Sequence, residues 1–290
     1  MDNSDFSSGA QKSQDEFRND KSTDSFMKEL LEIAQGSPQE MPGGDRDVPD
    51  VYNRMLEKVR IQMVARSANA DRLSEVPHID MLDMAAVFRV VMPGDESIVS
   101  AAVTNSLLRR FNVAPEKFRQ DALHAAETNN PVRIEGLGSV LSELENREDN
   151  IYESPLVFAG TRDKMWGAGV IAYPKFMEEA AQKIGGDFFL LPSSVHEVLL
   201  LPDDGTMDTD YLKELVTSVN MTEVSPEERL TNNAYHYDAR ERVFDTVDHY
   251  REEQKKHSVL RVLDESRKAS VKENAVHDSF HSSLHQPPSL

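Results

Sequence analysis

Short apolar segments closed by turn sequences recur through the middle of the chain, and this pattern limits the fold more than any other feature. Met84–Met92 is continuously apolar apart from Arg89, which is typical of a strand buried on both faces. Pro93–Ser97 then combines a proline with a glycine, and Ile98–Thr104 follows as a second strand. A short connection that contains glycine predicts a β-hairpin between them.

The same pattern returns further along the chain. The remaining predicted strands are Leu156–Ala159 with Gly167–Tyr173, Phe188–Leu191 with Val195–Leu201, and the alternating segment Tyr235–Phe244. Glycine inside a strand often marks a bulge or a close backbone approach, as expected at Gly167 and Gly169. Strands joined by short turns run antiparallel. The sequence therefore predicts an α+β fold, with a mostly antiparallel sheet built from hairpins and helices packed on it.

Helical periodicity marks the segments between these strands. Pro49 is suited to the first turn of a helix, and an apolar stripe that includes Val51, Met55 and Val59 predicts a helix from there to about Ser67. Further helices are predicted over Ala114–Thr128, Ser139–Arg147, Pro174–Ile184 and Asp208–Val219.

Polar sequence at both ends divides the chain into four parts. We expect a disordered tail over 1–48, one α+β domain over 49–245, a charged helix over 246–273 and a disordered tail over 274–290. Within the first tail, Phe26–Ile33 is apolar enough for a turn or two of amphipathic helix. Isolated helices this short are marginal in water, so this segment is either a docking motif or incidental hydrophobicity.

Composition excludes several classes of protein. The chain has no cysteine, which rules out disulfides, thiol nucleophiles and iron–sulfur clusters. Its formal net charge of -19 repels nucleic-acid phosphates and anionic lipids, so we expect neither nucleic acid nor a membrane as a partner. No apolar run reaches the length of a bilayer span, and the first residues lack the pattern of a secretory signal. The expected compartment is the cytoplasm.

The densest polar cluster of the predicted domain runs from Pro192 to Glu197. Ser193, Ser194, His196 and Glu197 are the candidate catalytic residues, because a serine, a histidine and a carboxylate can form a nucleophilic triad. If this segment is a strand, however, His196 and Glu197 point to opposite faces, and the glycine-flanked nucleophile elbow is absent. The alternatives are a serine-rich turn with a hydrogen-bonded histidine and a non-catalytic binding edge.

Three other groups of residues could form a site. His78, Asp80 and Asp83 could bind a metal, but no second spaced histidine lies nearby, so a capped loop is the alternative. Tyr235 and Tyr237 share one face of a predicted strand. They could form an aromatic platform for a ligand, or they could pack against a neighbouring strand. A set of tail histidines could sequester metal weakly, namely His277, His281 and His285. No cofactor is predicted.

Four stretches carry a resemblance to a known family. They are Val76–Ala85, Thr104-Asn105 with Val113–Phe118, Gly167–Pro174 and Leu191–Val198. Over about residues 50–245 the chain resembles a family of uncharacterised proteins from gut-dwelling Gram-positive bacteria, catalogued as a domain of unknown function. The resemblance implies a bacterial cytoplasmic protein and no particular activity.

Because no catalytic signature is complete, we expect a non-catalytic interaction or regulatory module that presents an acidic or sheet-edge surface to a protein partner. Two alternatives stay open. One is a small-ligand enzyme or hydrolase centred on Ser193, Ser194 and His196. The other is an acidic inhibitor of a DNA-binding protein, which would require the acids to line up in a track.

Overall fold

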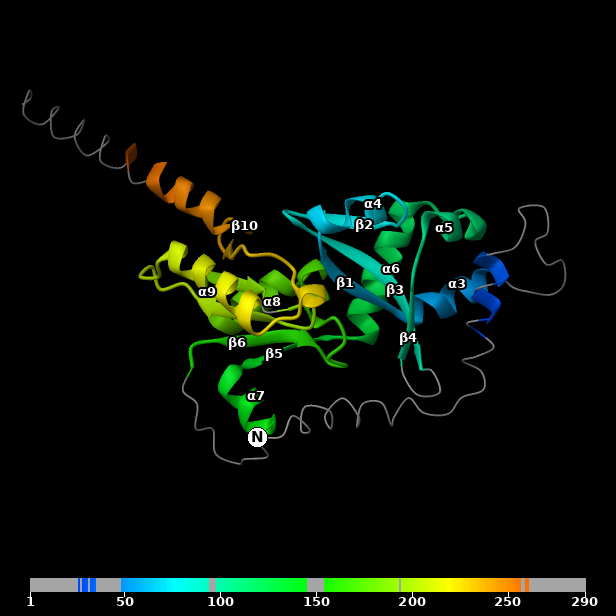
Figure 1. The fold of residues 1–290 in the computed structure, drawn as a ribbon, viewed down its shortest axis with the longest axis horizontal. Helices are drawn as coiled ribbons and strands as arrows, with labels where there is room; N and C mark the ends of the chain where they lie inside the picture. The colour runs from blue at the N-terminus through cyan, green and yellow to red at the C-terminus, as the bar shows by residue number, and fades with distance from the viewer. Residues whose placement is uncertain are drawn as a thin grey trace, which may run out of the picture. The chain divides into compact units, whose positions relative to one another are not determined.

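The computed structural model of the chain describes residues 26, 28–30, 32–34, 48–93, 98–144, 154–192, 194–256 and 259–260 (Figure 1). The chain divides into two compact units, residues 1–245 and residues 246–290. In the second unit, residues 247–256 form a helix. Most of the predicted tails, the histidines of the C-terminal tail and much of the predicted charged helix lie outside the described residues. No helix in the described ranges is both long and apolar enough to cross a bilayer.

The predicted α+β class is confirmed, with two antiparallel sheets in place of one. The first sheet has four strands: β1 Val59–Ala65, β2 His78–Met81, β3 Met84–Pro93 and β4 Ile98–Ala102. The second has six strands in the order β10-β9-β7-β8-β6-β5. Their bounds are β5 Val132–Gly136, β6 Val157–Thr161, β7 Phe188–Pro192, β8 Val198–Pro202, β9 Tyr235–Asp238 and β10 Val243–Thr246.

Strand β3 organises the first sheet. β1 pairs with it from Met84 to Val90. β2 pairs with the first part of β3, and β4 pairs with its second part, where Pro93 lies opposite Ile98. The predicted hairpin between β3 and β4 is therefore present in the structure.

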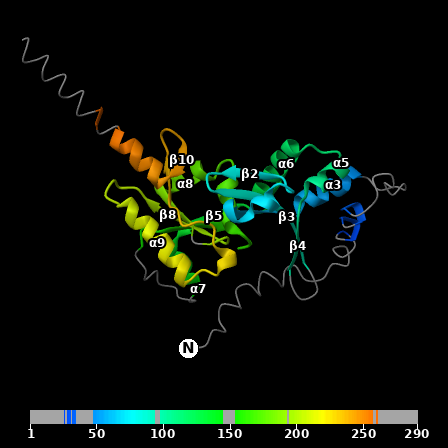
Figure 2. The same cartoon turned by 45° about the horizontal axis from the view of Figure 1, so that its top comes forward.

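The helices pack around these two sheets. They are α3 Val48–Glu57, α4 Ala70–Leu73, α5 Asn105–Phe111, α6 Pro115–Asn129, α7 Leu137–Leu144, α8 Phe176–Ile184 and α9 Thr209–Thr222. Figure 1 shows α3, α5 and α6 beside the first sheet and α8 and α9 beside the second, and the tilted view in Figure 2 keeps this grouping. Phe88 of β3 meets Phe118 of α6 edge to face at 5.2 Å in the buried core.

The predicted first helix ends ten residues early, and this prediction was wrong. The helix stops at Glu57, and the following segment is strand β1. Val59, Ile61 and Met63 are buried, whereas Arg60 and Gln62 between them are partly exposed. That alternation has the period of a strand. Pairing with β3 decides the conformation, because strand preference depends on partners that are distant in sequence.

The predicted strand Gly167–Tyr173 is also wrong: residues Gly167–Ala172 form a 3-10 helix, η2. Strand β6 pairs instead with β5 and β8. A Cβ added at Gly169 would overlap the carbonyl oxygen of Ile61 in β1, and one at Gly167 would overlap the carbonyl oxygen of His196. The two glycines thus allow η2 to lie directly against the backbone of both sheets, which is the close approach that glycine permits.

Residues 26–34 differ from the predicted disorder where they are described. Phe26 and Leu30 are buried among core residues of the domain. The guanidinium of Arg54 lies over the Phe26 ring at 4.9 Å and forms a 2.9 Å ion pair with Glu29. The core of the domain supplies the apolar surface that so short a helix needs, so Phe26 and Leu30 pack on their own domain.

Candidate functional sites

Residues 194–197 form a turn ahead of β8, so the predicted strand from Val195 begins only at Val198. Ser194 Oγ donates to Glu197 Oε1 at 3.0 Å and accepts from the backbone N–H of His196 at 3.0 Å. The backbone N–H of Ser194 donates to the Glu197 carbonyl at 3.3 Å. These bonds close the turn, as a serine does when it satisfies the backbone around it. Ser193 lies outside the described residues.

His196 finds its carboxylate on a distant element. Its Nε2 lies 3.3 Å from Oε1 of Glu228, which ends the short helix η3 (Pro226–Glu228). Both side chains are about half exposed. A triad needs the serine hydroxyl to donate to the imidazole, whereas Ser194 donates to Glu197. The structure thus brings Ser194, His196 and Glu197 into one turn without that relay, and their catalytic role stays a prediction.

Of the three residues considered for a metal, His78 and Asp80 lie side by side, with His78 Nε2 3.7 Å from Asp80 Oδ1, but Asp83 does not join them. His78 Nδ1 contacts the Val76 carbonyl at 3.0 Å, and Asp80 pairs with Arg66 at 3.0 Å. Asp83 lies in the turn between β2 and β3 and has other partners. In the part of the chain that the structure describes, no three histidine, cysteine, aspartate or glutamate side chains gather as metal ligands.

Asp83 ties the β2–β3 turn to the segment that leads into β9. Its carboxylate accepts hydrogen bonds from Thr231 Oγ1 at 2.6 Å, from Asn233 Nδ2 at 2.8 Å and from the Tyr235 hydroxyl. Burial favours the neutral carboxyl, but these three bonds outweigh it and hold the pKa of Asp83 below its ordinary value. Burial, together with the bond to Asp83, raises the pKa of Tyr235.

The tyrosines of β9 pack inside the second sheet. Tyr235 stacks on Phe244 at 5.3 Å, and Tyr237 meets Phe188 at 5.4 Å. Both tyrosines are buried. They therefore pack against neighbouring strands and do not form an exposed aromatic platform. His236, which alternates with them, lies 3.0 Å from Asp203 in an equally buried pair.

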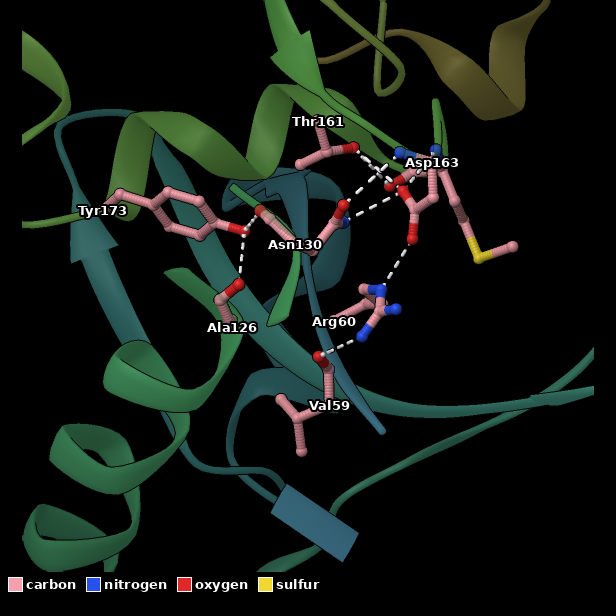
Figure 3. Close-up of polar contacts among 8 residues, drawn as sticks. Val59, Arg60, Ala126, Asn130, Thr161, Asp163 and Tyr173 are labelled. Carbon is pink, nitrogen blue, oxygen red and sulfur yellow. Dashed lines mark hydrogen bonds and ion pairs between the residues drawn. The ribbon is translucent and has the colours of Figure 1, made fainter. Parts of the chain in front are cut away.

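A polar network joins the two sheets (Figure 3). Arg60 of β1 donates to Asp163 at 2.7 Å, and Asn130, just after α6, donates to the other carboxylate oxygen at 2.9 Å. Thr161 and the backbone of Met165 bond the same carboxylate. With so many donors already on Asp163, the network is a structural clamp. Sequence analysis missed it because its members are far apart along the chain.

Tyr173 extends this clamp toward helix α6 (Figure 3). Its hydroxyl donates to the carbonyl oxygens of Asn130 at 2.9 Å and Ala126 at 3.2 Å. Burial raises the pKa of Tyr173, so the phenol keeps its proton and remains a donor.

Strand β4 leaves the first sheet with an open apolar edge. Among the described strands it pairs only with β3. Ile98 is 38% exposed and Val99 is 45% exposed, although Met92, which lies opposite Val99, is buried. β4 carries no charged side chain. The apolar face of the sheet therefore continues past β3 and ends uncovered at β4.

Two other sheet edges are covered or blocked. Helix η2 packs against β1, so that Gly169 contacts the Ile61 carbonyl. At β5, Lys183 donates to the Ile134 carbonyl, and Arg133 makes two 2.7 Å bonds to Glu135. Charged side chains, and lysine above all, are a common means of keeping an edge strand from pairing with another chain. β4 itself carries no charged side chain, and the cation that reaches it is Arg89 of β3, which donates to the Ser100 side chain and carbonyl.

The comparisons with known proteins show a family without naming an activity. A family model described as a family of unknown function (DUF5688) matches residues 11–239, and the chain belongs to that family. The family resemblance is thereby confirmed, while an origin in gut-dwelling Gram-positive bacteria stays a prediction. No curated protein and no solved structure matches the chain.

Proposed function

We propose that this member of the DUF5688 family is a non-catalytic interaction module that binds an extended segment of a basic protein along the outer edge of β4. The observation that carries the proposal is the open apolar edge, with Ile98 and Val99 exposed and no charge along the strand. Addition of a strand to an exposed sheet edge is a common mode of peptide recognition, in which backbone hydrogen bonds supply much of the affinity.

The backbone groups that would bind the segment follow from the register of the sheet. The Val103 N–H donates to the Phe88 carbonyl at 3.0 Å. In an antiparallel ladder the groups of alternate residues point to opposite sides, so those of Val99 and Ala101 point toward β3. The groups of Ile98, Ser100 and Ala102 point outward. The Ser100 carbonyl accepts a 3.3 Å bond from Arg89, which leaves its second lone pair for a partner.

Charge favours a different, basic protein over a second copy of this chain. The chain has 51 acidic and 32 basic residues, with a net charge of -19. Two copies would repel each other, whereas a basic partner is attracted over long range. The segment we expect is apolar on the side that meets Val99 and Ala101, and it carries lysine or arginine on its other side.

A short peptide of alternating lysine and valine, with a fluorescent label, tests the proposal. Its binding to the full chain is measured by fluorescence anisotropy, beside the matched peptide in which glutamate replaces lysine. The lysine peptide should bind more tightly. Ser100→Pro removes an outward N–H and no backbone bond of the sheet, although it also removes the Ser100 Oγ that accepts from Arg89. It should weaken binding by about tenfold, the equivalent of one lost hydrogen bond.

Ser100→Ala is the matched control, because it keeps the backbone N–H and should leave peptide affinity unchanged. Val99→Lys serves as a second edge variant that repels the peptide without altering the backbone. Equal binding of the lysine peptide to all four proteins would show that β4 is not its site.

A further inference from the structure

A cleft of about 370 Å³ opens between α5, the start of α6 and the segment that leads into β2. Its apolar lining includes Leu73, Val76, Leu108 and Val113, which come from two stretches of the chain, residues 73–78 and 105–119. Pockets for small ligands have volumes of about 300–1,000 Å³ and combine an apolar lining with a few polar groups. The cleft has that size and character.

The charged residues of the cleft are all basic. Arg109 of α5 and Arg119 of α6 line it, and its described lining contains no aspartate or glutamate. In a chain of net charge -19 this is a locally positive site. Arg109 is exposed and has no acidic partner among the described residues. Arg119 contacts Glu116 at 3.2 Å, but that carboxylate is 71% exposed and the contact is therefore weak.

The other polar side chains of the cleft bond to the protein itself, and His78 Nε2 lies 3.7 Å from Asp80 Oδ1. His78 Nδ1 contacts the Val76 carbonyl, and Asn105 Nδ2 donates to the Ser74 carbonyl at 3.3 Å. These bonds fix the walls of the cleft. The two guanidinium groups are the cationic donors of the lining, and guanidinium groups bind carboxylate and phosphate through paired N–H donors.

We propose that this cleft binds a small amphipathic anion, an apolar chain or ring that carries one carboxylate or phosphate. The apolar part packs on Leu73, Leu108 and Val113, and the oxyanion binds Arg109 and Arg119. The site is distinct from the outer edge of β4 and does not depend on the function proposed there.

The test is a titration of the full chain, labelled with ¹⁵N, followed by two-dimensional NMR. Hexanoate and hexyl phosphate are the two oxyanion probes, and hexanamide is the neutral counterpart of the same shape. Either probe should shift the amide resonances of Leu108 and Val113 until the site is saturated. The probe that binds more tightly shows whether the site prefers a carboxylate or a phosphate. Hexanamide should bind at least about fivefold more weakly, the loss expected for an exposed charged contact.

Arginine variants locate the anion. Arg109→Gln and Arg119→Gln should each weaken the tighter probe by about fivefold. Arg110→Gln is the matched control, since Arg110 is on the same helix but does not line the cleft. Equal affinity for hexanamide, an equal loss in Arg110→Gln, or shifts that scatter over the surface without saturating would overturn the proposal.

Discussion

At the scale of single residues, Gly169 holds η2 against β1 because it has no side chain to meet the Ile61 carbonyl. Gly169→Ala would force the backbone of β1 or of η2 to move. We predict a loss of about 3 kcal/mol in the free energy of unfolding, as for other overpacked sites. Urea denaturation measures it. Gly186→Ala is the control, because a Cβ there meets nothing within 4 Å and should change stability by less than about 0.5 kcal/mol.

Asp83 makes stability depend on pH in a definite direction. Its pKa is lower in the folded protein than the ordinary value of 3.8. The stability it contributes is therefore complete above pH 3.8 and is lost as pH falls through the lower, folded pKa. Asp83→Asn should cost about 1.5–3 kcal/mol at pH 7, since it removes a charged acceptor of three hydrogen bonds. Urea denaturation at a series of pH values should show this difference shrinking in acid.

Asp80→Asn is the matched control for Asp83, because Asp80 is about half exposed and pairs only at the surface. Its removal should cost less than about 1 kcal/mol. If the loss of stability caused by Asp83→Asn stays constant down to the lowest pH at which the protein is folded, the charge of Asp83 does not stabilise the fold.

At the scale of elements, the Arg60–Asp163 pair connects β1 to the loop after β6. A double-mutant cycle with Arg60→Met and Asp163→Leu should give a coupling energy of about 1–3 kcal/mol, because both side chains are mostly buried. The pair of Asp50 and Arg54 on α3 is the control. Its expected coupling energy is about 0.4 kcal/mol, the value typical of exposed ion pairs four residues apart on a helix. Similar coupling energies for the two pairs would show that Arg60 and Asp163 do not clamp the two sheets together.

The elements that sequence analysis predicted well are those with a local signal. β3, β4 and the turn between them follow from an apolar run and a Pro-Gly sequence. β1 was missed because Val59 continues the helical stripe of Val51 and Met55, and only pairing with β3 distinguishes the two conformations. η2 was missed because Gly167 and Gly169 match a bulged strand equally well. A side chain at either glycine is excluded by carbonyl oxygens of Ile61 and His196, which lie in other parts of the fold.

The candidate sites divide in the same way. A serine-rich turn ahead of β8 could be predicted, because serine bonds the backbone around it, but the turn runs on to Glu197 where a strand was expected from Val195. Glu228 could not, since the partner of His196 is 32 residues away with no pattern that links them. The cleft beside Arg109 and Arg119 is formed by segments whose proximity depends on the fold. Two of them, around Val76 and Asn105, belong to the stretches that carry the family resemblance.

At the scale of the whole molecule, net charge should govern association. The lysine–valine peptide should bind several-fold more weakly when salt is raised from about 0.1 M to 1 M, because the Debye length falls from about 10 Å to 3 Å. The glutamate–valine peptide should bind no more weakly at the higher salt, since its repulsion is screened. Fluorescence anisotropy at several salt concentrations measures both. If salt weakens the binding of both peptides equally, charge does not explain the preference for the lysine–valine peptide.

The most direct test of the open edge is hydrogen exchange of the β4 amides, followed by NMR with and without the lysine–valine peptide. In the free protein the amides of Val99 and Ala101 should exchange slowly, and those of Ile98, Ser100 and Ala102 should exchange quickly. Bound peptide should slow the exchange of these three outward amides. Unchanged exchange at β4 under saturating peptide, or new protection elsewhere on the domain, would contradict strand addition at this edge.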